Sequence, residues 1–200
     1  MLIKLANGEK IEYEGSATLK DVLLEKDKSL LKEYVGARLD GERIDFHQVL
    51  APDAQVELIE WASQEAAWIY RHSLSHVLAQ AVLRLFPNTQ LAIGPAIADG
   101  FYYDFDVETP FSPEDLKKIE KEMRHVVKQN HKFGRQEVNR DEALTMIADA
   151  PYKQEILEDL GNEETLSFYQ DGEFVDLCRG PHVLSTGQVK HFKLLSVAGA

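Results

Sequence analysis

The sequence has a single cysteine, no long apolar run and no excess of basic residues, and each absence excludes a class of protein. Because Cys178 is alone among 200 residues, an internal disulfide is excluded, which fits a reducing cytoplasm. No apolar stretch has the length that a bilayer span needs, and the first residues lack the apolar segment of a signal peptide. We therefore expect a cytoplasmic protein with no membrane partner.

The charge balance is the reverse of that in a free-standing nucleic-acid binder. The chain has 34 acidic and 22 basic residues, for a net charge of -12, whereas phosphate contacts normally require a basic surface. An RNA contact would therefore need a local basic patch. One candidate patch comprises Lys117, Lys118, Lys121, Arg124, Lys128, Lys132 and Arg135. The alternative is a solvated helix face with partner charges.

Length and pattern predict two domains of α+β class. Hydrophobic residues make up 44% of the chain, enough for a sizeable core, and the pattern changes near residue 61. Residues 1–61 read as strand, strand, helix and further strands, which is the order of a small β-grasp (ubiquitin-like) domain. Residues 62–200 are expected to form a larger domain with long helices and an antiparallel sheet.

Helix and turn signals divide the second region. Ser63 can cap a long helix that ends near Phe86, and Ser112-Pro113 begins another. Glycine turns punctuate two strands within residues 91–105. A strand is expected at 133–138, helices at 141–149 and 151–160, and a final hairpin that turns at Asp171-Gly172.

Two pairs of residues are candidates for a catalytic or metal-binding site. His72 and His76 share one face of the first helix because they are four residues apart. Cys178 follows the last strand directly, and Arg179-Gly180-Pro181 lets His182 fold back toward it. Such a set can hold a metal ion or orient a water. The alternative for the histidine pair is a buried, hydrogen-bonded place in the core.

Several motifs occur in an order that resembles the amino-terminal part of a bacterial-type threonyl-tRNA synthetase. They are H-S-L-S-H, I-G-P-A-I-A-D-G-F-Y-Y-D-F, Y-K, D-L-C-R-G-P-H and H-F-K-L-L-S-V-A-G-A. The resemblance covers essentially the whole chain, with residues 1–61 resembling the TGS domain and 62–200 the editing domain. The family continues past Ala200, so we expect a fragment whose editing domain is truncated. ATP, Mg and Zn would then belong only to the missing synthetic part, and the full-length enzyme would be a homodimer.

The resemblance also implies roles for particular residues. The substrate would be the 3′ acceptor end of tRNA(Thr) carrying serine, which water hydrolyses. His72 and His76 would orient or deprotonate that water, and Lys153 would stabilise the oxyanion or hold the 3′ end. Asp176 would bind the serine ammonium group, Tyr103 and Gly94 would line the pocket for the terminal adenosine, and Cys178 and His182 would complete its wall. From the sequence alone, Lys153 could equally be a solvated surface lysine, and the aromatic run around Tyr103 could be sheet core.

Alternatives remain open for the metal and for the function. Editing would need no cofactor. The set of His72, His76, Cys178 and His182 also resembles that in the editing domains of alanyl-tRNA synthetases, in which a similar set holds zinc, and it is an acceptable tetrahedral zinc set. A free-standing trans-editing deacylase is a second enzymatic interpretation. The third is a non-catalytic tRNA-binding or regulatory module with a structural metal site.

Overall fold

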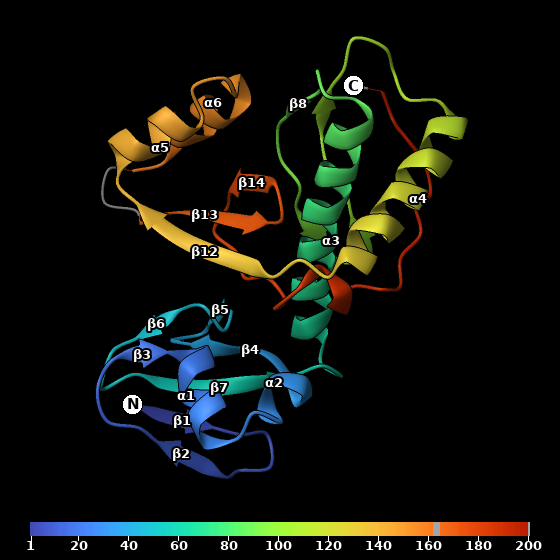
Figure 1. The fold of residues 1–200 in the computed structure, drawn as a ribbon. Helices are drawn as coiled ribbons and strands as arrows, with labels where there is room; N and C mark the ends of the chain where they lie inside the picture. Colours follow the sequence, from blue (N-terminus) through green and yellow to red (C-terminus); the bar gives the residue numbers. More distant parts are fainter. Residues whose placement is uncertain (162–164, 200) are drawn as a thin grey trace. The chain divides into compact units, whose positions relative to one another are not determined.

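The computed structural model describes residues 1–161 and 165–199, which fold as a mixture of helices and small sheets of α+β class (Figure 1). Two compact units form. The first contains Met1–Tyr70 together with the short segment Gly180–Leu184, and the second contains Arg71–Arg179 and the chain from Ser185 onward. The long helix α3 (Gln64–Leu85) begins in the first unit and continues in the second.

A five-stranded mixed sheet forms the first unit. Its strand order is β2-β1-β7-β4-β5, in which β1 pairs in parallel with β7 and the other neighbours are antiparallel. The strands are β1 (Leu2–Lys4), β2 (Lys10–Glu12), β4 (Tyr34–Leu39), β5 (Glu42–Ile44) and β7 (Gln55–Glu60). A short pair, β3 (Ala17–Thr18) with β6 (Val49–Leu50), lies outside the sheet. The expected order of strand, strand, helix and further strands is confirmed, with the additional short β3 before the helix.

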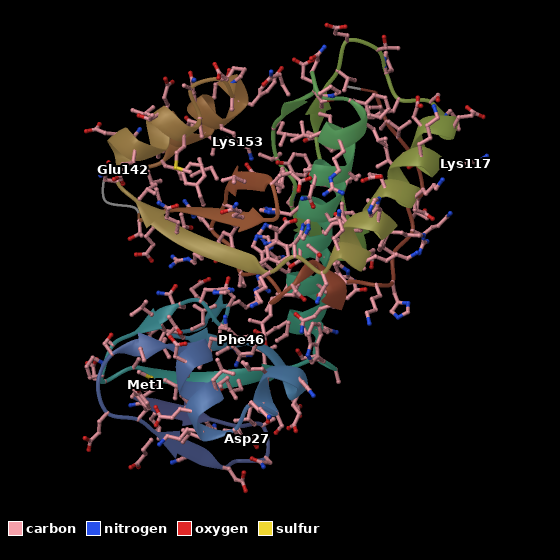
Figure 2. All side chains as sticks on the ribbon, in the orientation of Figure 1. Met1, Asp27, Phe46, Lys117, Glu142 and Lys153 are labelled. Carbon is pink, nitrogen blue, oxygen red and sulfur yellow. The ribbon has the colours of Figure 1, made fainter. Side chains whose placement is uncertain are left out.

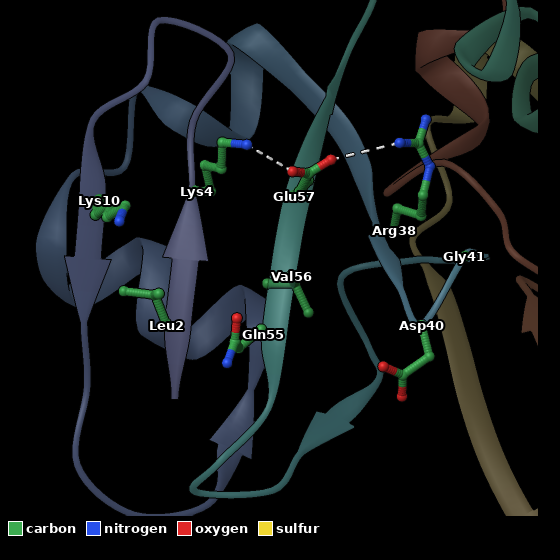
Figure 3. Close-up of a pocket in the computed structure, with 9 residues that line it drawn as sticks. All are labelled: Leu2, Lys4, Lys10, Arg38, Asp40, Gly41, Gln55, Val56 and Glu57. Atoms are coloured by element: carbon green, nitrogen blue, oxygen red, sulfur yellow. Dashed lines mark hydrogen bonds and ion pairs between the residues drawn. The ribbon is translucent and has the colours of Figure 1, made fainter.

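Two helices complete this unit. The Thr18 hydroxyl accepts a hydrogen bond from the Asp21 N–H and so caps α1 (Leu19–Lys26). The short α2 (Leu30–Glu33) follows. Side chains from α1 meet those of the central strands in one apolar core that includes Leu19, Leu23, Ile3 and Val56. Its exposed surface carries a shallow pocket where Glu57 lies between Lys4 and Arg38 (Figure 3); no predicted site residue lines that pocket.

The second unit is built on a three-stranded antiparallel sheet of order β12-β13-β14. These strands are β12 (Phe133–Val138), β13 (Leu166–Asp171) and β14 (Phe174–Leu177). The predicted hairpin turn is confirmed: Gly172 adopts a φ of 61°, where a side chain would be strained. Helices α5 (Arg140–Met146) and α6 (Pro151–Asp159) pack on this sheet through one apolar cluster that includes Ala143, Leu157 and Phe168.

Helix α4 (Pro113–Gln129) begins where the sequence predicted. The Ser112 hydroxyl accepts from the Asp115 N–H at 3.2 Å, and the Asp115 carboxylate accepts from the Ser112 N–H at 3.1 Å. Asn130 ends the helix in the left-handed conformation, with φ 54°. The 3-10 turn η1 (Thr186–Gln188) is attached to α4, because the Thr186 hydroxyl donates to the Val126 carbonyl at 3.1 Å.

Two expectations need correction. Residues 91–105 form four two-residue strands rather than two longer ones: β8 (Gln90–Leu91) pairs with β11 (Phe105–Asp106), and β9 (Ala96–Ile97) pairs with β10 (Gly100–Phe101). Helix α5 ends at Met146, earlier than the predicted 149, and Gln154 from α6 donates to the carbonyls of Ile147 and Ala148 beyond it. In the described part of the chain, every helix is too short or too polar to cross a bilayer.

Candidate functional site

Helix α3 supplies the two histidines of the candidate site. It begins after Ser63, whose hydroxyl accepts from the Ala66 N–H at 3.1 Å, and one of its faces bears His72 and His76. The two rings lie edge to face with centroids 5.5 Å apart. His76 is only 2% exposed and also lies edge to face with Phe174 of β14 at 5.5 Å.

Burial determines the protonation of His76. Loss of hydration lowers the pKa of His76 well below the usual value for histidine, and the nearby His72 and Lys153 lower it further. The imidazole is therefore neutral near pH 7 and retains a nitrogen that can accept a proton.

Cys178 comes to the same place from the end of β14. Its backbone N–H donates to the Ser167 carbonyl at 3.0 Å, and the Ser167 hydroxyl donates to the Cys178 carbonyl at 2.6 Å. The Cys178 Sγ lies 3.3 Å from the His72 Nε2. The ligand atoms of His72, His76 and Cys178 all lie within 4.8 Å of one another. Three of the four residues predicted from spacing are thus gathered by the second unit.

His182, the fourth, belongs to the segment that packs with the first unit. It is 1% exposed, and its backbone N–H donates to the Asp45 carboxylate at 3.2 Å. Leu184 of the same segment packs against the apolar core of that unit. The expected approach of His182 to Cys178 stays a prediction.

A second polar group in the same unit joins Lys153, Asp176 and Tyr103. The Lys153 Nζ lies 2.8 Å from Asp176 Oδ1 and 3.0 Å from Oδ2, and the Tyr103 hydroxyl donates to Oδ2 at 2.8 Å. Lys153 and Asp176 are each 6% exposed. The interpretation of Lys153 as a solvated surface residue is therefore wrong, because α6 directs this side chain into the interior (Figure 2).

Burial raises the pKa of both the carboxyl group and the phenol of this group. Burial raises the pKa of Asp176, while Lys153 and Tyr103 oppose that rise by favouring the charged form. Burial also raises the pKa of Tyr103, and the neighbouring Asp176 adds to the effect. Tyr103 is therefore a hydrogen-bond donor throughout the physiological range.

Gly94 and Tyr103 meet as a close pair. A Cβ on Gly94 would lie 2.2 Å from the Tyr103 Cδ2, so no other residue fits here without moving the ring. The Ser75 hydroxyl, on α3 between the two histidines, lies 2.6 Å from the Gly94 carbonyl. Tyr103 also stacks on Phe105 at 5.0 Å and is 7% exposed. The predicted contact of this pair with an adenosine stays a prediction.

Sequence reasoning missed Gln80 and Asp171, which lie farther along the same helix and hairpin. Gln80 is four residues beyond His76, and its Nε2 donates to the Asp171 carbonyl at 3.0 Å. The i, i+4 spacing from His76 was a usable signal for Gln80. Asp171 was assigned only to a turn, yet its side chain is fully buried.

The donors in the second unit suit zinc. Histidine nitrogens and a cysteine sulfur are its preferred ligands, and the 3.3 Å separation of Cys178 Sγ and His72 Nε2 matches the edge of a tetrahedral site. The positive charge of Lys153 disfavours binding of a metal ion here, because it already lowers the pKa of His76 by disfavouring a second positive charge. His72, His76 and Cys178 are the residues that would hold the ion.

Comparison with known proteins relates the chain to enzymes of protein biosynthesis. Residues 166–199 match the family described as "Threonyl and Alanyl tRNA synthetase second additional domain". Over 200 residues the chain is 48% identical to the threonine–tRNA ligase of Clostridium tetani (strain Massachusetts / E88), covering 99% of this chain and 31% of the relative. It is 45% identical to that of Clostridium botulinum (strain Hall), covering 99% and 32%. The chain thus spans about a third of the length of the curated relatives it matches.

Proposed function

We propose, on the premise of this similarity to threonine–tRNA ligases, that the chain is the editing part of such a ligase and hydrolyses mischarged Ser-tRNA(Thr). The observation that carries the proposal is the gathering of His72, His76 and Cys178 in one unit with the buried pair of Lys153 and Asp176. A histidine that is neutral at pH 7, as the lowered pKa of His76 implies, suits ester hydrolysis by water when a cation lies nearby.

The need for such a site follows from the small difference between the two amino acids. Serine lacks one methyl group of threonine, and one methyl is worth about 1–3 kcal/mol in a binding pocket, or roughly 10- to 200-fold. A synthetic site therefore charges some serine. A second site that admits serine and excludes threonine by size removes the error.

In the proposed reaction, His76 accepts a proton from a water molecule, or orients it, as the water oxygen attacks the seryl carbonyl carbon. The bond between that carbon and the ribose oxygen breaks, and the ribose hydroxyl leaves with a proton. His72, which lies beside both His76 and Cys178, shares the orienting role. Cys178 serves as a polar wall rather than a nucleophile, because water attack needs no acyl intermediate.

Lys153 and Asp176 would act together. The Lys153 ammonium supplies positive charge for the oxyanion or the 3′ end, and its contacts to Asp176 and Tyr103 hold it in place. A carboxylate has about four lone pairs, so Asp176 can also accept from the serine ammonium group. His182, Tyr103 and Gly94 would complete the wall and the adenosine pocket.

The remaining parts of the proposal concern the longer protein. The mixed sheet with parallel β1 and β7 supports the interpretation of the first unit as a TGS domain. ATP, Mg and Zn would serve the synthetic part of a homodimeric cytoplasmic ligase. Editing itself would need no metal; a zinc ion held by His72, His76 and Cys178 is the alternative, and it would supply a Lewis acid.

The test is hydrolysis of Ser-tRNA(Thr) compared with Thr-tRNA(Thr) by this chain. We expect release of serine but not threonine, and loss of activity in both His72→Ala and His76→Ala. Wild-type rates in both variants would refute the assignment. A non-catalytic RNA-binding module would instead protect the ester from spontaneous hydrolysis. A trans-editing protein would hydrolyse it equally well, and the length of the native gene product would separate that alternative.

A further inference from the structure

Helix α4 carries a row of basic side chains on its exposed face. Lys117, Lys121, Arg124 and Lys128 are spaced four, three and four residues apart, so they share one face of the helix. All four are exposed, and the apolar residues Ile119, Met123, Val126 and Val127 occupy the opposite, buried side. We call these four basic residues the α4 stripe; Figure 2 shows Lys117 at the outer side of the helix.

Within the described part of the chain, the ion pairs made by acidic residues of α4 reach only one member of this stripe, Arg124. Glu120 lies 2.9 Å from Arg124 and 3.1 Å from Lys193, and it also accepts from the Leu194 N–H. Glu122 lies 2.9 Å from Arg84 of α3, and Asp115 lies 2.8 Å from Lys118. Each of these carboxylates is thus already engaged.

Three lysines of the stripe have no ion pair within 4 Å among the described residues. Among residues 1–161 and 165–199, the ion pairs of α4 involve Arg124 and Lys118 but not Lys117, Lys121 or Lys128. The basic Lys132, three residues after the end of the helix, is also exposed. In a chain of net charge -12, such a concentration of free positive charge is a local feature.

The first unit offers a contrast in the way its lysines are placed. Its lysines alternate with acids along the chain, as in Glu25-Lys26-Asp27-Lys28, and Lys4 and Lys26 each lie within 4 Å of a glutamate. Such alternation gives a surface of mixed sign, which has little attraction for a polyanion. Acids and bases also alternate along α4, as in Glu120-Lys121-Glu122, but the helical spacing there places the four basic residues of the stripe on one face.

We propose that the α4 stripe is a docking surface for the phosphate backbone of an RNA. Lys128 is eleven positions after Lys117, which corresponds to about 16 Å along the helix axis and therefore to several successive phosphates. The free lysines suit phosphates because each is a mobile point charge on an exposed stem. The inference rests on the proposed function only for the choice of RNA as the polyanion.

Direct binding tests the proposal. The probe is an unacylated RNA hairpin with a single-stranded 3′ end, and its affinity for the whole chain is measured by fluorescence anisotropy over a series of salt concentrations. The test variant is Lys117→Gln, Lys121→Gln and Lys128→Gln together. The matched control is Lys10→Gln, Lys28→Gln and Lys32→Gln, which removes the same charge from exposed positions of the first unit.

We expect the stripe variant to bind roughly tenfold to a hundredfold more weakly near 0.1 M salt, because it releases about two to three fewer counterions. The slope of log K against log salt should fall in magnitude by the same two to three, while the control keeps nearly the wild-type slope. Unchanged affinity of the stripe variant, or an equal loss in the control, overturns the proposal. Wild-type affinity for polyglutamate equal to that for RNA also overturns it, since the surface would then recognise any polyanion.

Hydrolysis separates failure of this inference from failure of the proposed function. The seryl ester of adenosine has no stem to dock, so its hydrolysis should be equal in the stripe variant and wild type. With Ser-tRNA(Thr), the stripe variant should show a raised KM and an unchanged kcat. If neither ester is cleaved by wild type but RNA binding depends on the stripe, the editing proposal fails and the docking surface stands.

Discussion

Two aspartates of the same hairpin are both buried, but among the described residues only one of them has hydrogen-bond partners for its carboxylate. Asp176 on β14 is 6% exposed and is contacted by Lys153 and Tyr103. Asp171, at the end of β13, is fully buried, and neither of its carboxylate oxygens has a hydrogen-bond partner within the described residues. A buried carboxylate must be paired or protonated. The difference therefore distinguishes a carboxyl that is held by a cation and a phenol from one that has no such side-chain partners among the described residues.

The pKa values follow this difference. Burial raises the pKa of Asp171 to about 8, and repulsion by Glu173 adds to it, against a smaller opposing effect of Arg84. At Asp176, the ammonium of Lys153 opposes the same effect of burial. Asp171 is thus a neutral acid at pH 7, whereas Asp176 is stabilised as the partner of a cation.

The largest expected effect is on the pH dependence of stability, through Asp171. Its pKa is higher in the folded state, about 8, than the usual 3.8, so its stabilising effect is complete below pH 4 and is lost as the pH rises to 8. The free energy of unfolding of the wild-type protein should fall by up to about 1.4 kcal/mol per pH unit as the pH rises from 4 to 8. Asp171→Asn should remove this slope in urea unfolding curves. Asp149→Asn, an exposed control, should leave it unchanged; an identical slope in all three proteins would contradict the assignment.

Removing the partner of Asp176 should have the next largest effect. Lys153→Met leaves a buried carboxylate without its cation and should cost about 3–5 kcal/mol of unfolding free energy. The double variant Lys153→Met with Asp176→Leu should recover most of that stability but no hydrolysis of Ser-tRNA(Thr). Chemical unfolding and deacylation measure the two properties separately. Equal stability of wild type and the single variant would contradict the pairing.

Gly94→Ala should have a smaller effect. Its Cβ would lie 2.2 Å from the Tyr103 ring, so the ring must move and its hydroxyl must leave Asp176. We expect a loss of about 1–3 kcal/mol and a lower Tyr103 pKa in spectrophotometric titration. Gly100→Ala is the control, because nothing lies within 4 Å of a Cβ there. A fully stable Gly94→Ala protein with unchanged tyrosine titration would rule out this packing.

Cys178→Ser should have the smallest effect if water is the nucleophile. The hydroxyl can replace the contact of Sγ with His72, so deacylation should fall less than about tenfold, which corresponds to about 1.4 kcal/mol. Elemental analysis of protein purified without added metal should find less than one zinc per chain. Stoichiometric zinc, with activity lost on chelation and in Cys178→Ser, would favour the metal-dependent alternative.

Much of the architecture could be predicted because local sequence signals dictate it. The capping box of Ser112 and Asp115, the turn at Asp171-Gly172 and the shared face of His72 and His76 each depend on residues within one or two turns of chain. For the candidate site, spacing predicted only that His72 and His76 share a face; Cys178 was grouped with them by residue type and by the family resemblance, and the structure places its Sγ 3.3 Å from the His72 Nε2. The four short strands between residues 90 and 106 were less predictable, since two-residue strands leave almost no periodic pattern.

By itself the sequence determined the α+β class, the helix that carries the histidines and the hairpin that ends at Cys178. Only the tertiary structure decided the environments of the polar residues. Lys153 is buried because α6 packs on the sheet and directs this side chain to Asp176. Asp171 is buried at the end of β13, where Gln80 of α3 donates a hydrogen bond to its carbonyl. Burial depends on contacts between segments far apart in the chain, and burial is the largest cause of the pKa shifts of His76, Asp171 and Asp176.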